Sequence, residues 1–572
     1  MTKRTTALLC VILSLFTLLY LRIYFIGKDN TIAQVANQQG TYTLKADKIK
    51  GRIYDRNFEQ LVNNNALPTY AIVPNAESMK FILDIIPQEE TERIYDLFST
   101  EKPFLYGGIG EGISIDSDSM TLLPTKKRYS DSQLAVHIIG HLDGDGKGVA
   151  GIEKAYDDVL DELSGNISIT YDVDALSGVL WGTVPTINND RYDNEQGVVL
   201  SLDRRIQTLV ERVGSKSIEK GSILVMDCES GQIIASASFP KFNPNDVADS
   251  LNAQNAPLVN RSFSPYNIGS VFKLTVIAAA LENGVSTDYT YECTGSIQVG
   301  DTVFHCLNRG GHGEIDMNKA TQVSCNPYFV HLAMEEVGEA RIREMAVNMG
   351  FGSPNELAPN FGAASGVIPT SEDLENPVEF GNFSFGQGKL TATPLQIAQS
   401  LSVFANGGYL VDPTVTLGIS DQSGKNILKT EGNNQPIRVL DENVANTVKD
   451  LMENVVLEGS GRNANPDFGG AGGKTGSAQT GNYDELGEEI VHAWFGGFFP
   501  ADHPRYTVVV LNEGADSGSL YSAPLFKEIA DGINLLDEYN RPWYKQILLE
   551  QSKSEEESEQ VGDGEGMEEI IE

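Results

Sequence analysis

Residues 268–284 read IGSVFKLTVIAAALENG, and this stretch decides how the rest of the chain is interpreted. The apolar run after Lys273 contains strong helix formers, and Gly284 is a suitable residue just beyond a helix C-terminus. We therefore expect Ser270 at or near the helix N-terminus, with Lys273 one turn later on the same face. A serine hydroxyl becomes a good nucleophile when a neighbour takes its proton, and burial lowers the pKa of a lysine enough for that task. The pair predicts a nucleophile and its base.

The S-x-x-K tetrapeptide alone is weak support for this chemistry. It recurs at Ser99, Ser217 and Ser238. Ser270 differs from these because a long apolar helix follows it, Gly269 precedes it and two further motifs lie downstream.

The first downstream motif is Ser324-Cys325-Asn326-Pro327. Its S-x-N pattern recurs at Ser164, Ser250 and Ser353. Taken alone, the motif favours a structural interpretation in which Asn326 is a helix N-cap and Pro327 the first helical residue. A catalytic interpretation needs the other motifs.

The second downstream motif is Lys474-Thr475-Gly476-Ser477, within the glycine-dense run GGAGGKTGSAQTG at residues 469–481. K-[ST]-G occurs once in the chain. A phosphate-binding loop is the alternative, but that loop lies between a buried strand and a helix. The residues that follow, SAQTGNYDE, do not begin a helix, so this alternative is disfavoured.

Together the three motifs resemble the penicillin-recognising serine acyltransferases. Ser324 follows Ser270 by 54 positions and Lys474 follows it by 204, in the family's order. The whole chain looks like a class B penicillin-binding protein, a monofunctional peptidoglycan D,D-transpeptidase. Further segments similar to that family are GRIYDRN at 51–57, HIIGHLDGDGKGVAGIEKAYDDVL at 137–160, SFGQGKLTATPLQIA at 384–398 and HAWFGGFFP at 492–500. No glycosyltransferase domain lies between the expected membrane anchor (1–27) and the expected pedestal domain (28–195), which separates the chain from the bifunctional class of penicillin-binding proteins.

The resemblance implies roles for eight residues. The catalytic group comprises Ser270 as nucleophile, Lys273 as its base, and Ser324, Asn326 and Lys474 as the relay to the leaving amine. The substrate-binding group comprises Thr475, which with Lys474 would hold the terminal carboxylate, Gly476, which lets the peptide backbone approach, and Ser477, whose backbone N–H would complete the oxyanion site with that of Ser270. The chain departs from the family pattern at Ile268, where proline is usual, and at Ser477, where threonine is common.

The fold class that we predict is a multidomain α+β protein, because 572 residues exceed what one hydrophobic core serves. Residues 222–239 read as an antiparallel hairpin, and strands return at 492–499 and 506–513, so the terminal strands should close one antiparallel sheet flanked by helices. The expected parts are a cytoplasmic stub and transmembrane anchor (1–27), a mixed α/β pedestal of the penicillin-binding protein dimerisation type (28–195), the transpeptidase domain (196–545) and an acidic disordered tail (551–572).

The anchor is predicted from residues 7–26, ALLCVILSLFTLLYLRIYFI, which carry a single charge at Arg22. A helix of this length spans about 30 Å, the hydrocarbon thickness of a bilayer. Lys3 and Arg4 precede it, which places the N-terminus in the cytoplasm and the catalytic domain outside. A cleaved signal peptide, the alternative, would have a shorter apolar core and small residues at its cleavage site.

Composition excludes several other functions. The chain has 42 Lys and Arg against 79 Asp and Glu, a net charge of −37, which would repel nucleic acid. The chain has five cysteines, none of them in a C-x-x-C pair, and seven histidines. This composition predicts neither a bound metal nor a cofactor.

The cysteines permit two interpretations. Cys293 and Cys306 flank a predicted hairpin, and they could form a disulfide outside the cytoplasm or remain two packed thiols. We expect Cys325 to be a packed spacer within its motif, and His312 to fix a loop.

Three alternative functions share some of these features. A β-lactamase or penicillin sensor has the motifs without this pedestal, a D,D-carboxypeptidase would use water as acceptor, and a non-enzymatic scaffold would need a damaged site. By resemblance, the expected partners are peptidoglycan stem peptides, β-lactams that acylate Ser270, and a SEDS-type glycan polymerase in the membrane.

Overall fold

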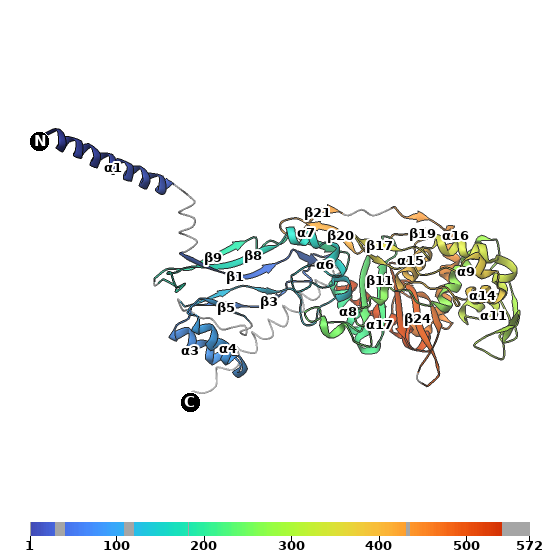
Figure 1. Cartoon of the computed structure of the whole chain (residues 1–572). Helices are drawn as coiled ribbons and strands as arrows, with labels where there is room; N and C mark the ends of the chain where they lie inside the picture. The colour runs from blue at the N-terminus through green and yellow to red at the C-terminus, as the bar shows by residue number, and fades with distance from the viewer. Residues whose placement is uncertain are drawn as a thin grey trace, which may run out of the picture. The chain divides into compact units, whose positions relative to one another are not determined.

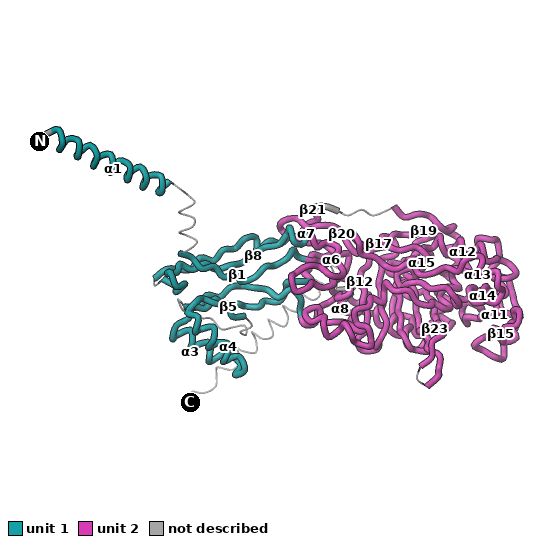
Figure 2. The backbone as a smooth tube through the Cα atoms, in the orientation of Figure 1, with its two compact units in different colours: residues 1–52, 62–130, 159–196 teal, residues 53–61, 131–158, 197–572 magenta. Residues whose placement is uncertain are grey.

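The computed structural model describes residues 2–28, 40–107, 119–180, 182–430, 435–484 and 486–539 (Figure 1). The expected acidic tail at 551–572 lies outside these ranges. The chain forms two compact units (Figure 2). Unit 1 consists of residues 1–52, 62–130 and 159–196, and unit 2 of residues 53–61, 131–158 and 197–572. Two segments within the range expected for the pedestal, 53–61 and 131–158, therefore belong to unit 2.

The N-terminal segment is a single helix, α1 (Thr2–Lys28), as predicted. Among the described residues it is the one helix long and apolar enough to cross a membrane. Its charged side chains lie near the two ends, which is the distribution that a lipid-spanning helix requires because a charge at the bilayer centre is costly.

Unit 1 contains two small antiparallel sheets with strand orders β1-β8-β9 and β5-β4-β6. Their bounds are β1 (Thr41–Ile49), β4 (Thr69–Ile72), β5 (Phe104–Gly107), β6 (Met120–Leu123), β8 (Gly165–Asp172) and β9 (Thr186–Asp190). Helices α3 (Ala76–Ile85) and α4 (Thr91–Ser99) pack on the second sheet through Ile82, Ile94 and Phe98. The mixed α/β character expected for the pedestal is thus present in unit 1.

Unit 2 is built on a five-stranded sheet with the order β12-β11-β25-β24-β23. The strands are β11 (Gly221–Asp227), β12 (Ile233–Phe239), β23 (Gly472–Tyr483), β24 (Glu489–Phe499) and β25 (Tyr506–Glu513), and each neighbouring pair is antiparallel. The hairpin β11–β12 pairs with strands from the C-terminal end, as the sequence predicted. Strand β23, which carries the Lys-Thr-Gly motif, lies at the edge.

Helices cover both faces of this sheet (Figure 1). On one face α8 (Arg204–Ser217) and α17 (Ala523–Tyr539) bury a cluster that includes Phe495 and Phe499 of β24. On the other face α15 (Pro394–Ala405) comes so close that a Cβ on Gly496 would lie 2.7 Å from Leu401. Because side chains alternate along a strand, one strand serves both layers.

The stretch at 268–284 forms a short 3₁₀ turn, η4 (Gly269–Phe272), followed by α9 (Lys273–Glu282). Residues 273–280 of α9 are all buried, so this helix is a core element and not a surface helix. Gly284 adopts a positive φ of 83°, which ends the helix as predicted.

Candidate active site

The structure brings the first and third motifs together. Ser270 lies in η4, half-buried, and accepts a backbone hydrogen bond from the N–H of Lys273. A Cβ on Gly269 would lie 3.0 Å from the carbonyl oxygen of Ser477, and one on Gly476 would lie 3.1 Å from that of Ile268. These two glycines therefore allow the turn that carries Ser270 to pack directly against the edge strand β23. A Cβ on Gly476 would also lie 3.1 Å from Cβ of Trp494 on β24, so the turn and the neighbouring strand both enclose this glycine. The approach of a substrate backbone to Gly476 stays a prediction.

Two lysine amines converge on one hydroxyl. Nζ of Lys273 lies 3.1 Å from Ser324 Oγ, and Nζ of Lys474 lies 3.0 Å from the same atom. Lys273 also donates to the carbonyl oxygen of Ser324 at 2.8 Å and to Oδ1 of Asn326 at 2.7 Å. Four of the eight residues with predicted roles, Lys273, Ser324, Asn326 and Lys474, thus form one small polar site, and Ser270 lies one turn before Lys273.

Burial strongly affects both amines. Desolvation, and then the neighbouring charge of Lys474, lower the pKa of Lys273 well below its ordinary value. Burial alone lowers the pKa of Lys474 from 10.5 to about 7. Two ammonium groups bound to one buried oxygen would repel each other, so the arrangement favours a state in which one amine is neutral at physiological pH. A neutral amine is what a proton acceptor requires.

The second motif differs from its predicted local structure. Helix α11 (Asn326–His331) begins at Asn326, with Cys325 at the N-cap position and no side-chain cap among the described residues. The N-cap interpretation of Asn326 was therefore wrong, because its side-chain oxygen is engaged by the Lys273 amine. Ser324 has a φ of 54°, an uncommon conformation for a residue with a side chain. A strained backbone conformation of this kind persists where the surrounding contacts hold it in place, often at functional sites.

The side chains of the third motif, on β23, differ in their burial. Lys474 and Thr475 are buried, whereas Ser477 is exposed. The hydroxyls of Thr475 and Ser460 are 2.9 Å apart, and Ser460 was not identified from the sequence because a lone serine after a helix carries no signal. The motif lies within a long strand and no helix follows it directly, which excludes the phosphate-loop alternative.

Residues 221–531, more than half of the chain, match the family model described as the penicillin binding protein transpeptidase domain. The chain belongs to this family. It is 29% identical over 537 residues to stage V sporulation protein D of Bacillus subtilis, covering 87% of this chain and 80% of that protein. It is 26% identical over 422 residues to peptidoglycan D,D-transpeptidase FtsI of Escherichia coli, covering 72% and 67%. These relatives identify it as a class B penicillin-binding protein.

The fold of this penicillin-binding protein also matches solved structures. One of them, described as structural coordination of polymerization and crosslinking by a peptidoglycan synthase complex, superposes with a TM-score of 0.68 at 23% identity, covering 91% of this chain and 98% of the other. At this identity the similarity establishes the shared fold, including the expected transpeptidase domain with helices around an antiparallel sheet.

The buried Lys474 should reduce the stability of this penicillin-binding protein. The pKa of Lys474 is about 7 in the folded protein, whereas the ordinary value of 10.5 applies in the unfolded chain. Between these two pH values the unfolded state therefore binds one more proton than the folded state. Stability should rise with pH across this window, by up to about 1.4 kcal/mol per pH unit, and fall as pH drops toward 7. We expect Lys474→Met to raise the thermal midpoint of unit 2 at pH 7 and to weaken this pH dependence while penicillin acylation declines. The measurement is thermal unfolding from pH 7 to 10.

The matched control is Lys220→Met, at a lysine that is not buried. Lys273 keeps its own lowered pKa in both proteins, so some pH dependence remains. A Lys474→Met protein that melts at a lower temperature than the control at every pH would contradict the assigned cost of burying this amine.

A second group of polar side chains lies next to the second motif. The predicted hairpin is confirmed as β14 (Ser296–Val299) and β15 (Thr302–His305), and Cys293 and Cys306 flank it. Both are free thiols within the described part of the chain. Cys325 and His312 lie in the same cluster. The sequence predicted a packed spacer at Cys325 and a loop-fixing role for His312, and did not predict that the four side chains meet. The overlooked signal is the spacing of 13, 6 and 13 positions between Cys293, Cys306, His312 and Cys325.

Proposed function

We propose that this protein is a peptidoglycan D,D-transpeptidase that cross-links stem peptides through an acyl-enzyme ester on Ser270. The observation that carries the proposal is the convergence of Lys273 and Lys474 on Ser324 Oγ beside the turn that holds Ser270. A partly exposed hydroxyl, one turn from a buried amine with a lowered pKa, is the arrangement that activates a serine nucleophile.

In the first half-reaction, Ser270 Oγ attacks the carbonyl of the penultimate D-Ala of a stem peptide. Lys273 accepts the hydroxyl proton, a step for which a positioned base typically contributes about 10²- to 10⁴-fold. Ser324, held between two amines, passes a proton to the nitrogen of the departing D-Ala. Asn326 supports this relay because its Oδ1 accepts from Lys273 and fixes the direction of the amine.

The developing oxyanion would lie between the backbone N–H groups of Ser270 and Ser477. Removing one such donor costs about 10²- to 10³-fold in a comparable acyl-transfer site. Strand β23 is a sheet edge, so a stem peptide can add to it as a further strand while Thr475 and Lys474 bind its terminal carboxylate. In the second half-reaction an amine of a neighbouring stem peptide attacks the ester, and Ser270 is released.

A purified full-length protein in detergent, given a stem pentapeptide ending in D-Ala-D-Ala and an amine acceptor, tests the proposal. We expect cross-linked product to increase with acceptor concentration, together with one D-Ala released per bond formed. Ser270→Ala should give neither. Release of D-Ala at a rate independent of the acceptor, without cross-linked product, would establish a carboxypeptidase instead.

We further infer that α1 anchors the protein with its N-terminus in the cytoplasm and unit 2 outside. The two cations before the apolar run, Lys3 and Arg4, support this orientation. A SEDS-type glycan polymerase is the proposed membrane partner, because a cross-linking enzyme anchored by one helix needs newly made strands close by. Protease protection of unit 2 in sealed spheroplasts, compared with lysed ones, would contradict the orientation.

A further inference from the structure

Four potential metal ligands from three segments of unit 2 converge on one point. The ligand atoms of Cys293, Cys306, His312 and Cys325 all lie within 4.8 Å of one another. The Sγ atoms of Cys293 and Cys325 are 3.4 Å apart, and those of Cys306 and Cys325 are 3.9 Å apart. Nδ1 of His312 lies 3.4 Å from Sγ of Cys306.

These separations are the edges of a metal-binding tetrahedron. With Zn–S and Zn–N bonds of about 2.3 and 2.05 Å, tetrahedral geometry gives edges of about 3.8 Å between sulfurs and about 3.6 Å between sulfur and nitrogen. A disulfide would need sulfurs about 2.05 Å apart. We propose that Cys293, Cys306, His312 and Cys325 bind one zinc ion as a closed Cys3His site, each thiol releasing its proton to solvent as the metal binds.

The backbone around these residues supports a ligand site. Gly295 and Gly311 have φ values of 99° and 80°, and a Cβ on Gly311 would overlap the carbonyl oxygen of Cys293. The loop after Cys293 and the loop before His312 are thus in direct contact, and only glycine permits that approach. Backbone hydrogen bonds tie the same loops together: the N–H of His312 donates to the carbonyl oxygen of Cys293 at 3.0 Å, and the N–H of Cys306 donates to that of Gly295 at 3.0 Å. These bonds hold the ligand-bearing segments in place.

Ligand type and burial favour zinc. Three thiolates and one imidazole in a tetrahedral arrangement suit zinc, and four protein ligands leave no open position, as in structural sites. The three cysteines are at most 2% exposed, whereas His312 is partly exposed and offers a path for the ion. Cys228 is also buried but is not part of the cluster, so it provides a matched control.

The proposed site is directly connected to the catalytic motif. Cys325 lies between Ser324 and Asn326, and the side chain of Asn326 donates to the carbonyl oxygen of His305, the residue before Cys306. Ser324 and Asn326 are the residues that bind the Lys273 amine. A metal bound to both Cys325 and Cys306 would therefore hold this segment against residues 305–306. It would also help to maintain the positive φ of Ser324. The four ligands are positioning residues for the acylation chemistry.

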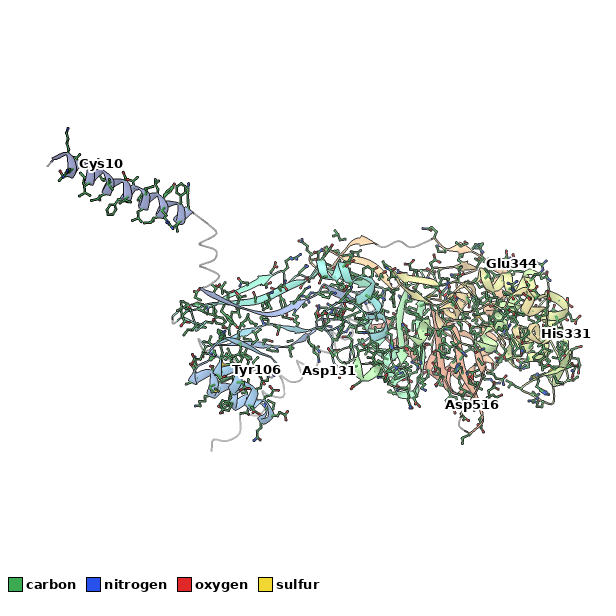
Figure 3. The ribbon with its side chains drawn as sticks, in the orientation of Figure 1. Cys10, Tyr106, Asp131, His331, Glu344 and Asp516 are labelled. Carbon is green, nitrogen blue, oxygen red and sulfur yellow. The ribbon has the colours of Figure 1, made fainter. Side chains whose placement is uncertain are left out.

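Metal content of the purified full-length protein tests the site without depending on its activity. The protein is purified under reducing conditions with an affinity tag that lacks histidine, then analysed by elemental mass spectrometry. We expect about one zinc per chain in the wild type, in Cys228→Ser and in Cys10→Ser, whose thiol lies on α1 (Figure 3). His312→Ala and Cys293→Ser should lose it. Equal zinc in the wild type and in these two variants would place the metal elsewhere and overturn the proposal.

Cobalt substitution in the wild-type protein avoids any problem of variant folding. We expect thiolate-to-cobalt charge-transfer bands and intense d–d bands of a tetrahedral site, with release of the ion by chelator. Chelated protein should react with fluorescent penicillin about 10- to 100-fold more slowly, and zinc should restore the rate. Two results would overturn the proposal. One is that the reduced protein, after zinc or cobalt is added, binds no zinc and shows no tetrahedral cobalt spectrum. The other is a disulfide between two of these cysteines whose reduced form binds no metal.

Discussion

Ser270→Ala is expected to abolish covalent labelling by a fluorescent penicillin, because the substitution removes the hydroxyl on which we propose that the acyl bond forms. The loss should exceed that of any other single change in the site, since no other described side chain on η4 can replace the nucleophile. The substitution deletes one oxygen atom from a half-buried position, so folding should be unaffected. In-gel fluorescence after denaturation measures the acyl-enzyme directly.

Ser217→Ala is the matched control for this experiment. Ser217 begins another S-x-x-K tetrapeptide, ending at Lys220, but it is exposed in the last turn of α8 and far along the chain from the other motifs. Its labelling should equal that of the wild type. Labelling that persists in Ser270→Ala at the wild-type level would identify a different nucleophile and would also remove the basis of the proposed transpeptidation.

Lys273→Arg should slow penicillin acylation by about 10²- to 10⁴-fold, the contribution of a positioned base. An arginine keeps the positive charge but cannot lose its proton, so it separates the role of base from that of charge. Lys273→Met, which keeps the length and suits the buried position, should give a similar loss. The second-order rate constant of acylation, measured by rapid mixing, provides the comparison.

Lys220→Arg controls for a change of cation at a surface site. If Lys273→Arg acylates within tenfold of the wild type while Lys273→Met does not, the lysine would act through its charge and another group would be the base. Lys474 would then be the first candidate, because its amine contacts the same Ser324 oxygen and its pKa is about 7.

Local sequence patterns were sufficient for several elements of unit 2. The apolar run after Lys273 predicted a helix that is observed as α9, and Gly284 ends it through its positive φ. The hairpin at 222–239 and the return of C-terminal strands to the same sheet were also predicted correctly. These features depend on periodicity, helix termini and turn residues, which act between near neighbours and are visible in any single chain.

The second motif shows where local rules fail. Asn326 followed by Pro327 satisfies the preferences of an N-cap, yet the helix begins at Asn326 itself. The competing partner is the amine of Lys273, 53 positions earlier, and a fully buried amine left without acceptors would carry a large desolvation penalty. The positive φ of Ser324 likewise results from contacts made by distant segments.

The sequence by itself determined the S-x-x-K motif, the order and spacing of its partners, the membrane-spanning helix and the α+β class, because each of these depends on residue types at fixed local separations. Only the tertiary structure decided that both lysines contact Ser324, that Gly476 makes room for the turn that carries Ser270, and that three cysteines and a histidine meet next to the second motif. The physical reason is that burial and hydrogen-bond partners depend on which distant segments pack together, and residue spacing alone does not specify that packing.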